Sequence, residues 1–106
     1  MGFSEELIQQ VWDKARASNE MDATTWREDE CGAWIGRDEY GAPDGEFGWT
    51  ILNVSGGGPD VLENLRAFHH SNAFDPANGH AKCHMSADRD GVASYGRTFK
   101  PRNKKV

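Results

Sequence analysis

The sequence predicts a single small α+β domain, and three observations lead to this fold class. The chain has 106 residues, which is enough for one domain but not for two. An amphipathic helical pattern opens the chain, and short strand-like segments follow it, separated by turns rich in glycine. We expect the domain to span residues 1–96 and residues 97–106 to form a basic, flexible tail.

The opening helix has both a start signal and an apolar face. Ser4 is suited to cap its N-terminus, and Phe3 and Ile8 have the spacing of a hydrophobic staple. Asn19 is expected to help end it. The apolar residues that recur at helical spacing are Leu7, Ile8, Val11, Trp12 and Ala15. This face is therefore predicted to be part of the core.

Four later segments are predicted to be short strands. "CGAWI" at 31–35 and "FGWTILNV" at 47–54 are rich in apolar, aromatic and β-branched residues, and their tryptophans are expected in the core. "KCHMSAD" at 82–88 and "VASYGRTF" at 92–99 flank the turn sequence "DRDG".

The segment between residues 60 and 72 allows two interpretations. Val61, Leu62, Leu65 and His69 fall near one helical face, which favours a helix starting at Asp60. Alternatively, a turn and a short strand run through 64–68 and a helix starts near His69. In either case "DPANGH" ends helical structure, because the Asp-Pro pair disfavours helix and Asn-Gly favours a turn.

Charge is distributed unevenly along the chain. Residues 1–96 hold all 17 acidic residues and 7 of the 12 basic ones, whereas the tail holds five basic residues and no acid. An acidic body repels phosphate backbones and a basic tail attracts them. The tail is either a solvated chain end or a nucleic-acid-binding segment formed by Arg97, Lys100, Arg102, Lys104 and Lys105.

Compartment and redox state follow from the apolar runs and the cysteines. No apolar run has the length of a membrane span, and no charged-then-apolar leader opens the sequence, so we expect a cytoplasmic protein. Cys31 and Cys83 form no CxxC pair, and in a reducing cytoplasm they are expected to be buried thiols. A disulfide between them remains the alternative.

A longer pattern resembles a known family. "TTWREDECGAWIGRDEYG", then "GW", a glycine loop, "NL" and a histidine together resemble a small bacterial and phage family of HNH endonuclease-like domains, over roughly residues 3–72. The matching residues are Trp26, Asp29, Cys31, Gly32, Ala33, Ile35, Tyr40, Gly41, Gly48, Trp49, Asn64, Leu65 and His69. Most belong to the framework. The resemblance implies an HNH-like ββα-metal core and divalent-metal nuclease chemistry.

The sequence departs from this family where its catalysis resides. The family's metal-binding aspartate corresponds to Leu52, which cannot ligate a cation. Its general-base histidine corresponds to Asn53, whose amide cannot take up the proton of water. Asn64 matches the residue that orients the missing histidine, and Asn72 could match the terminal ligand. Asn53, Asn64 and His69 are therefore only remnants of a catalytic site.

A rearranged metal site is a further possibility. His69, His80, Cys83 and His84 lie close together in sequence, and His70 could replace His69. Imidazole and thiolate groups suit zinc, whereas the implied nuclease site would take magnesium or zinc. The spacing matches no closed zinc signature, and the alternative is surface histidines beside a buried cysteine.

These observations give three hypotheses for the function. The first is a catalytically degenerate HNH-like domain that acts by binding a protein of nucleic-acid processing or defence, as an inhibitor or adaptor, in a setting such as a phage-encoded inhibitor of host defence. The second is a nucleic-acid-binding module that uses the basic tail. The third is an active metal-dependent endonuclease with a relocated site. The missing Asp-His pair argues against catalysis, and the acidic body favours the first hypothesis.

Overall fold

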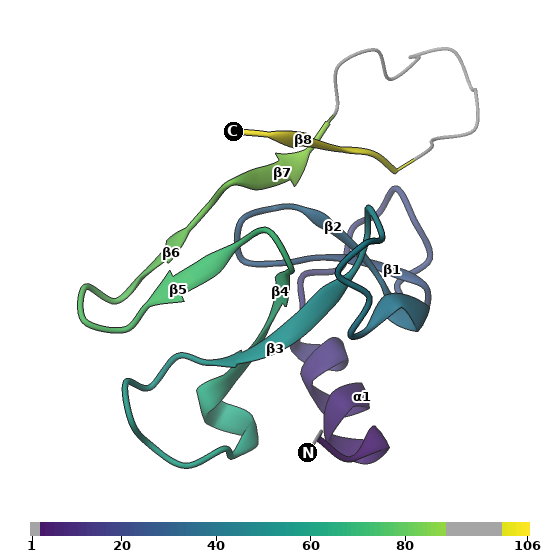
Figure 1. Ribbon diagram of the computed structural model, residues 1–106. Helices are drawn as coiled ribbons and strands as arrows, with labels where there is room; N and C mark the ends of the chain where they lie inside the picture. Colours follow the sequence, from purple (N-terminus) through teal and green to yellow (C-terminus); the bar gives the residue numbers. More distant parts are fainter. Residues whose placement is uncertain (1–2, 89–100) are drawn as a thin grey trace, which may run out of the picture.

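The computed structural model describes residues 3–88 and 101–106 (Figure 1). Within these ranges the chain forms one α-helix, two 3-10 turns and four two-stranded antiparallel sheets. The helical elements are α1 (Glu5–Lys14), η1 (Arg37–Glu39) and η2 (Leu62–Asn64). The paired strands are β1 (Trp26–Glu28) with β2 (Trp34–Gly36), β3 (Trp49–Asn53) with β4 (Leu65–His69), β5 (Ala73–Asp75) with β6 (His80–Lys82), and β7 (Met85–Ala87) with β8 (Asn103–Lys105).

Helix α1 begins where the sequence predicts and ends earlier. The Ser4 hydroxyl accepts a hydrogen bond from the Leu7 N–H at 3.1 Å, as expected of an N-cap. The helix ends at Lys14 rather than near Asn19, because Ala15 is already extended. Arg16 then forms an antiparallel bridge with Glu28, which draws the chain toward the first hairpin.

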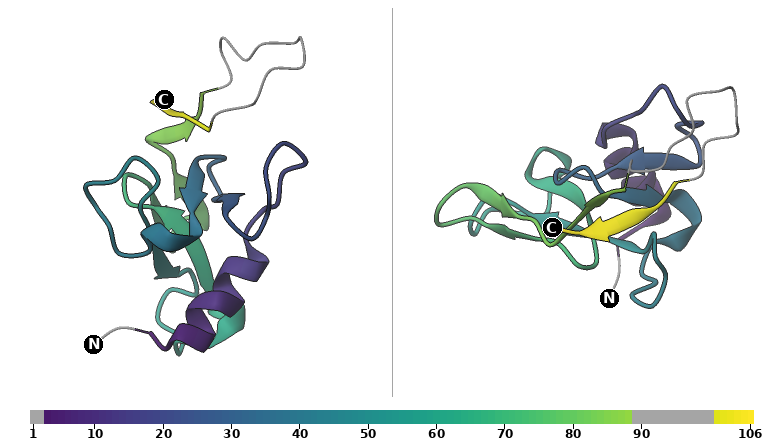
Figure 2. Two further views of the ribbon diagram at one scale, coloured as in Figure 1. Left: turned by 90° about the vertical axis from the view of Figure 1, so that its right-hand side faces the viewer. Right: turned by 90° about the horizontal axis from the view of Figure 1, so that it is seen from above.

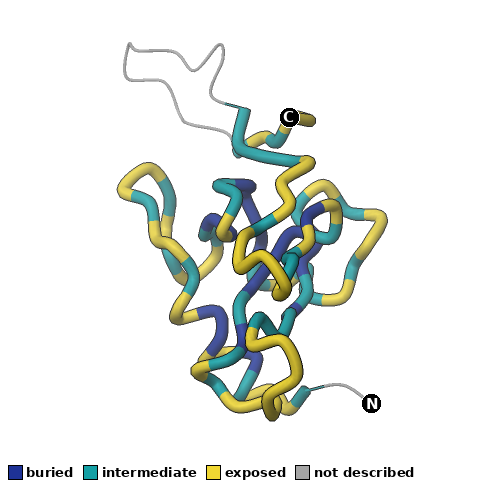
Figure 3. Tube along the Cα trace, turned by 90° about the vertical axis from the view of Figure 1, so that its left-hand side faces the viewer, coloured by how far each residue is buried: buried dark blue, intermediate teal, exposed yellow. Residues whose placement is uncertain are grey.

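The β3–β4 hairpin and α1 enclose the core. In this hairpin Trp49 pairs with His69 and Asn53 pairs with Leu65. The main core cluster consists of Ile8, Val11, Trp12, Ile35, Trp49, Ile51, Leu65 and Ala67. Trp34 and Trp49 are fully buried, which confirms their predicted place in the interior. The buried stretches lie in the centre of the molecule and the exposed ones in the outer loops (Figure 3).

The expected HNH-like ββα-metal core is wrong. The β3–β4 hairpin supplies two strands, and the interpretation with a strand through residues 64–68 is correct, but no helix begins near His69. Instead the chain continues into β5 and β6. The Asp75 carboxylate accepts a hydrogen bond from the Ala77 N–H, and Gly79 has φ +70°, so a tight turn forms where the metal-site helix would run. Only the coarse α+β class remains.

The C-terminal segment is attached to the fold in its described part. Strand β8 pairs with β7, and the Asn103 amide donates to the carbonyls of Trp34 and Glu46. Residues 103–105 are therefore paired with the rest of the fold. The strand expected at 92–99 and the tail residues 97–100 lie outside the described residues.

The two cysteines form a disulfide, so the expectation of buried thiols is wrong. Cys31 and Cys83 are joined with an S–S distance of 2.03 Å and a Cα–Cα distance of 5.5 Å. Cys31 lies between β1 and β2, and Cys83 lies between β6 and β7. The bond therefore links the β1–β2 turn to the connection between β6 and β7.

We call residues 3–72 the body and the described residues beyond Asn72 the arm. The core cluster lies entirely in the body. The β5–β6 ribbon projects from the body, and β7–β8 lies at the end of the body opposite the N-terminus (Figures 1 and 2). Among the described residues, no helix has the length and apolar character needed to cross a membrane.

Gly48 packs closely against the backbone of Ala42. A Cβ there would be 1.8 Å from the Ala42 carbonyl oxygen, and this backbone atom cannot move freely. Replacing Gly48 by alanine is therefore expected to lower the free energy of unfolding by about 1–3 kcal/mol in urea denaturation. Gly45→Ala is a matched control, because its close neighbour at 2.3 Å is the mobile end of the Glu39 side chain. Equal effects of the two changes would contradict this assignment.

Candidate functional site

Asn53 and Asn64 lie together, and both hold the glycine loop between β3 and β4. The Asn53 amide donates to the Gly58 carbonyl at 2.9 Å and to the Pro59 carbonyl at 3.1 Å. The Asn64 amide donates to the same Pro59 carbonyl at 2.9 Å. The Asn53 oxygen accepts hydrogen bonds from the backbone and the hydroxyl of Ser55. These amides therefore serve the loop's conformation.

His69 lies at the opposite end of the same hairpin. It pairs with Trp49, whereas Asn53 pairs with Leu65, so the two predicted remnants are four strand positions apart, or about 13 Å. The His69 Nδ1 accepts a hydrogen bond from the Ser71 N–H, so the ring's proton is assigned to Nε2. Nε2 donates to the Glu46 carbonyl at 2.6 Å. Both ring nitrogens are occupied within the protein.

The buried carboxylate of Asp29 organises this end of the body. Asp29 is 2% exposed, and its two oxygens accept four hydrogen bonds. The donors are the backbone N–H groups of Cys31, Ala33 and His69 and the side-chain amide of Asn72. From the sequence, Asp29 stands out only as one of the framework residues of the resemblance. The structure gives it a specific role, which is to join the β1–β2 turn to the end of β4.

Asn72 extends this network to the arm. Its amide also donates to the Met85 carbonyl at 3.0 Å, and its oxygen accepts the N–H groups of His84 and Met85, each at 2.8 Å. The residue that could match a terminal metal ligand therefore has its side chain fully engaged with protein groups. Asn72 positions the start of β7 rather than a cation.

The predicted zinc ligands are not assembled. The Cys83 sulfur is bonded to Cys31, and both ring nitrogens of His69 have protein partners. His80 and His84 are exposed on the arm. Within residues 3–88 and 101–106, no group of three or more His, Cys, Asp or Glu side chains could hold a metal ion. The donor set therefore does not fit zinc or magnesium.

His70, the possible substitute for His69, is partly buried. Its Nε2 atom is buried and has no hydrogen-bond partner among the described residues. Burial, followed by the neighbouring His69, lowers the pKa of His70 below its ordinary value. The ring is therefore neutral near pH 7 and lies against Gly48, since a Cβ on that glycine would be 3.1 Å from His70 Cδ2.

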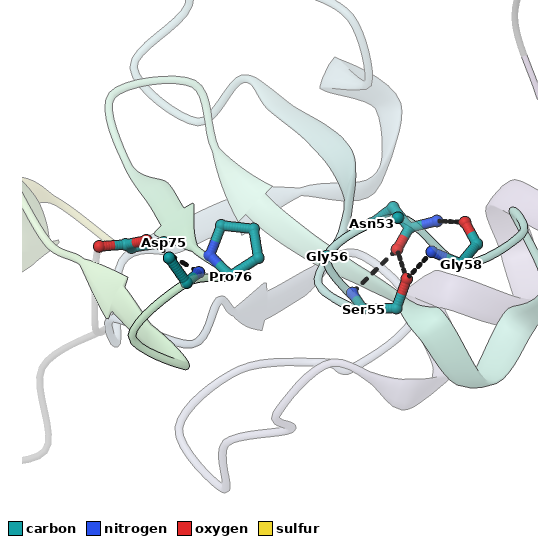
Figure 4. A pocket seen from close by; sticks show the side chains of 8 residues that line it. Asn53, Ser55, Gly56, Gly58, Asp75 and Pro76 are labelled. Carbon is teal, nitrogen blue, oxygen red and sulfur yellow. Dashed lines mark hydrogen bonds between the residues drawn. The ribbon is translucent and has the colours of Figure 1, made fainter.

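A pocket of about 690 Å³ opens beside the glycine loop (Figure 4). The loop lies on one side of the pocket and the start of the β5–β6 turn lies on the other. The lining residues are Asn53, Ser55, Gly56, Gly57, Gly58, Asp75, Pro76 and Ala77. The place of the expected nuclease centre is thus hollow, but it lacks a histidine or a cysteine.

The polar side chains of this pocket are engaged in local turns. The Ser55 hydroxyl donates to the Asn53 oxygen at 2.6 Å and accepts the Gly58 N–H at 2.8 Å. The Asp75 carboxylate accepts from the Asn78 side chain at 2.6 Å, and this bond is the main reason that the pKa of Asp75 lies below its ordinary value. A lowered pKa makes this carboxylate a weaker base, and its oxygens are already engaged in the turn. No acid–base pair faces the pocket.

The surface of the body is dominated by carboxylates. Residues 1–72 contain 14 acidic and 5 basic residues, and the remaining residues contain 3 acidic and 7 basic ones. Eleven of those 14 acidic side chains are exposed, namely Glu5, Glu6, Asp13, Glu20, Asp22, Glu30, Asp38, Asp44, Glu46, Asp60 and Glu63. They lie on α1, on η1 and η2, and on the connections between the body's elements. Most of the body's negative charge is therefore exposed to solvent.

The body's few cations mostly serve its own backbone. Lys14 donates to the carbonyls of Leu62 and Leu65, and Arg27 donates to those of Asp13, Ala15 and Ala23. Salt bridges of 3.7 Å join Arg16 to Glu28 and Arg37 to Glu5. The exposed carboxylates are thus only sparsely neutralised, so the body presents a negative potential to solvent.

The predicted nucleic-acid-binding residues fall partly on the arm. Arg102, Lys104 and Lys105 are exposed, with the two lysines on β8, whereas Arg97 and Lys100 lie outside the described residues. Lys82, on β6, is also exposed and belongs to the same arm. The described arm is therefore basic and the body acidic.

No protein family, curated protein or solved structure matches this chain. The roles assigned to these residues therefore depend on their geometry in the structure.

Proposed function

We propose that this protein acts by binding, and that its acidic body engages a basic surface on a protein of nucleic-acid processing or defence. The exposed carboxylates carry the proposal, since eleven of the body's 14 acidic side chains are exposed. A surface of this kind is complementary to the cationic channels that hold phosphate backbones. Binding there would exclude nucleic acid, which is the action of an inhibitor or an adaptor.

The absence of an assembled catalytic set among the described residues supports binding over cleavage. Leu52 and Asn53 stand where the HNH resemblance expects the metal ligand and the base, and Asn53 is committed to the glycine loop. Incubation with plasmid and Mg²⁺, Mn²⁺ or Zn²⁺ is therefore expected to give no cleavage above the metal-only control. Metal-dependent cutting that is lost in Asn64→Ala or His69→Ala would overturn the proposal.

Binding through the acidic body has a direct test in affinity capture from the native host. Glu6, Asp38 and Asp44 are exposed and make no salt bridge among the described residues. The triple variant Glu6→Gln, Asp38→Asn, Asp44→Asn is expected to reduce capture of a specific protein partner about tenfold at low salt. Raising the salt to about 0.5 M is expected to weaken capture by the unmodified protein, because exposed charges are screened.

A matched control separates the effect of charge from the effect of altering three surface positions. It is the triple variant Gln10→Ala, Ala17→Ser, Pro43→Ala, which changes three exposed positions and keeps the net charge. This variant should leave capture of the partner unchanged. Circular dichroism and thermal melting check that both variants fold. Equal capture by both variants would contradict the electrostatic proposal, as would recovery of nucleic acid in place of a protein partner.

A further inference from the structure

A second hollow in the body contains two cations that meet at one carbonyl oxygen. The Leu65 carbonyl accepts a hydrogen bond from the Lys14 Nζ and another from the Arg66 Nη1, each at 3.0 Å. Lys14 comes from the last turn of α1, and Arg66 comes from β4. This turn and the segment η2–β4 lie side by side (Figures 1 and 2). Helix packing therefore brings two like charges together.

No carboxylate neutralises this pair directly. Neither Lys14 nor Arg66 forms a salt bridge with an acidic side chain of the described residues. Burial, and then the Arg66 charge, lower the pKa of Lys14 below its ordinary value, although the charges of Glu30 and Glu63 act in the opposite direction. On a body with so many exposed carboxylates, two adjacent cations that form no salt bridge with a described residue are an exception.

The pair keeps donors available for a ligand. Lys14 uses two of its three N–H bonds on the carbonyls of Leu62 and Leu65. Arg66 uses its Nη1 group on the carbonyls of Glu63 and Leu65, and its Nε and Nη2 atoms donate to no described residue. An arriving oxyanion could therefore be bound by charge-assisted hydrogen bonds from both side chains.

Val61 and Leu62 form the apolar part of the hollow. It has a volume of about 630 Å³ and is lined by Lys14, Val61, Leu62, Glu63 and Arg66. Val61 is 41% exposed, which makes it one of two exposed large hydrophobic residues in the described part of the chain. This volume is typical of small-molecule sites, which combine apolar walls with a few polar anchors.

We propose that this hollow binds a small monocarboxylic acid, with its carboxylate against Lys14 and Arg66 and a short apolar chain against Val61 and Leu62. A single negative charge fits better than a phosphate dianion, because Glu63 lines the same hollow and repels additional charge. Of the eleven exposed carboxylates that carry the proposed binding function, Glu63 alone lines this hollow, and the variant of Glu6, Asp38 and Asp44 leaves it unchanged, so either proposal can fail without the other.

The test is a titration of the unmodified protein with small carboxylates at low salt. Binding is monitored through the amide NMR resonances. Hexanoate is expected to shift the resonances of η2 and the end of α1, and to bind at least about tenfold more tightly than acetate, which lacks the chain, or 1-hexanol, which lacks the charge. Hexyl phosphate is expected to bind more weakly than hexanoate. Equal binding of hexanoate and acetate, or of hexanoate and hexanol, would overturn the proposal.

Variants then assign the binding to this hollow. Arg66→Gln and Val61→Ser are each expected to weaken hexanoate at least about fivefold, whereas Glu63→Gln should strengthen it by removing a repelling carboxylate. Arg16→Gln is the matched control, because it removes an exposed cation that is paired with Glu28 elsewhere. Hexanoate binding that responds to Arg16→Gln as much as to Arg66→Gln would show general charge attraction and refute the site.

Discussion

Replacing Asp29 by alanine is expected to lower the free energy of unfolding by about 4 kcal/mol, since it leaves four donors without their acceptor. Each buried donor without a partner costs about 1–3 kcal/mol, and water entering the space would satisfy only part of the set. A small domain has only about 5–15 kcal/mol of stability in total. Urea denaturation, followed by tryptophan fluorescence, measures the loss.

The variant Asp29→Asn separates shape from acceptor capacity. It keeps the volume but replaces one accepting oxygen by an NH₂ group, which then faces N–H donors. We expect it to lower stability by about half as much as alanine does. Asp38→Asn makes the same chemical change at an exposed position, and it should alter stability by less than about 0.5 kcal/mol. Similar effects of the two Asn variants would show that the Asp29 network contributes little.

The importance of Asp29 could not be predicted from the sequence, because two of its four partners are distant along the chain. His69 and Asn72 are 40 and 43 residues away from it. The start of α1 and the strand β3 could be predicted, since a cap, an apolar period and β-branched residues lie within a few positions of each other. The local sequence pattern determines where helices and strands form, whereas the hydrogen-bond network of Asp29 depends on how those helices and strands pack together.

The chain after His69 illustrates a different limit. The resemblance implies a helix there, yet the Asp-Pro and Asn-Gly pairs that the sequence places at residues 75–79 form the turn of the β5–β6 hairpin. These pairs indicate a helix break but not which strands will pair across it. Likewise, the roles of Asn53 and Asn64 depend on the carbonyl of Pro59, which a motif comparison does not include.

The sequence leaves the disulfide as an alternative for a similar reason. Cys31 and Cys83 are 52 positions apart, and no spacing rule connects cysteines at such a separation. Their pairing requires the arm to fold back onto the β1–β2 turn, where the Ala87 N–H donates to the Gly32 carbonyl and the Ser86 hydroxyl donates to the Cys31 carbonyl. Such a bond is typical of proteins that reside in oxidising environments.

Removing this disulfide is expected to lower the free energy of unfolding by about 4 kcal/mol, the value that loop-closure entropy gives for a loop of this length. The enclosed loop contains β2, β3 and β4, so its closure limits the unfolded state of the core itself. The double variant Cys31→Ser, Cys83→Ser should therefore unfold at a lower urea concentration than the oxidised protein. The unmodified protein in excess reductant should match the variant.

Loss of the disulfide should also affect the arm more than the body in the native state. The core cluster contains no residue beyond Ala67, so α1 and the β3–β4 hairpin keep their packing, whereas β7 and β8 lose their nearby covalent link to the body and keep hydrogen bonds such as those of Asn72 and Asn103. Hydrogen exchange should rise first at β7 and β8. An equal rise in hydrogen exchange throughout the chain would contradict a body that is stable without the arm. Unchanged exchange would show that the polar contacts hold the arm without the disulfide.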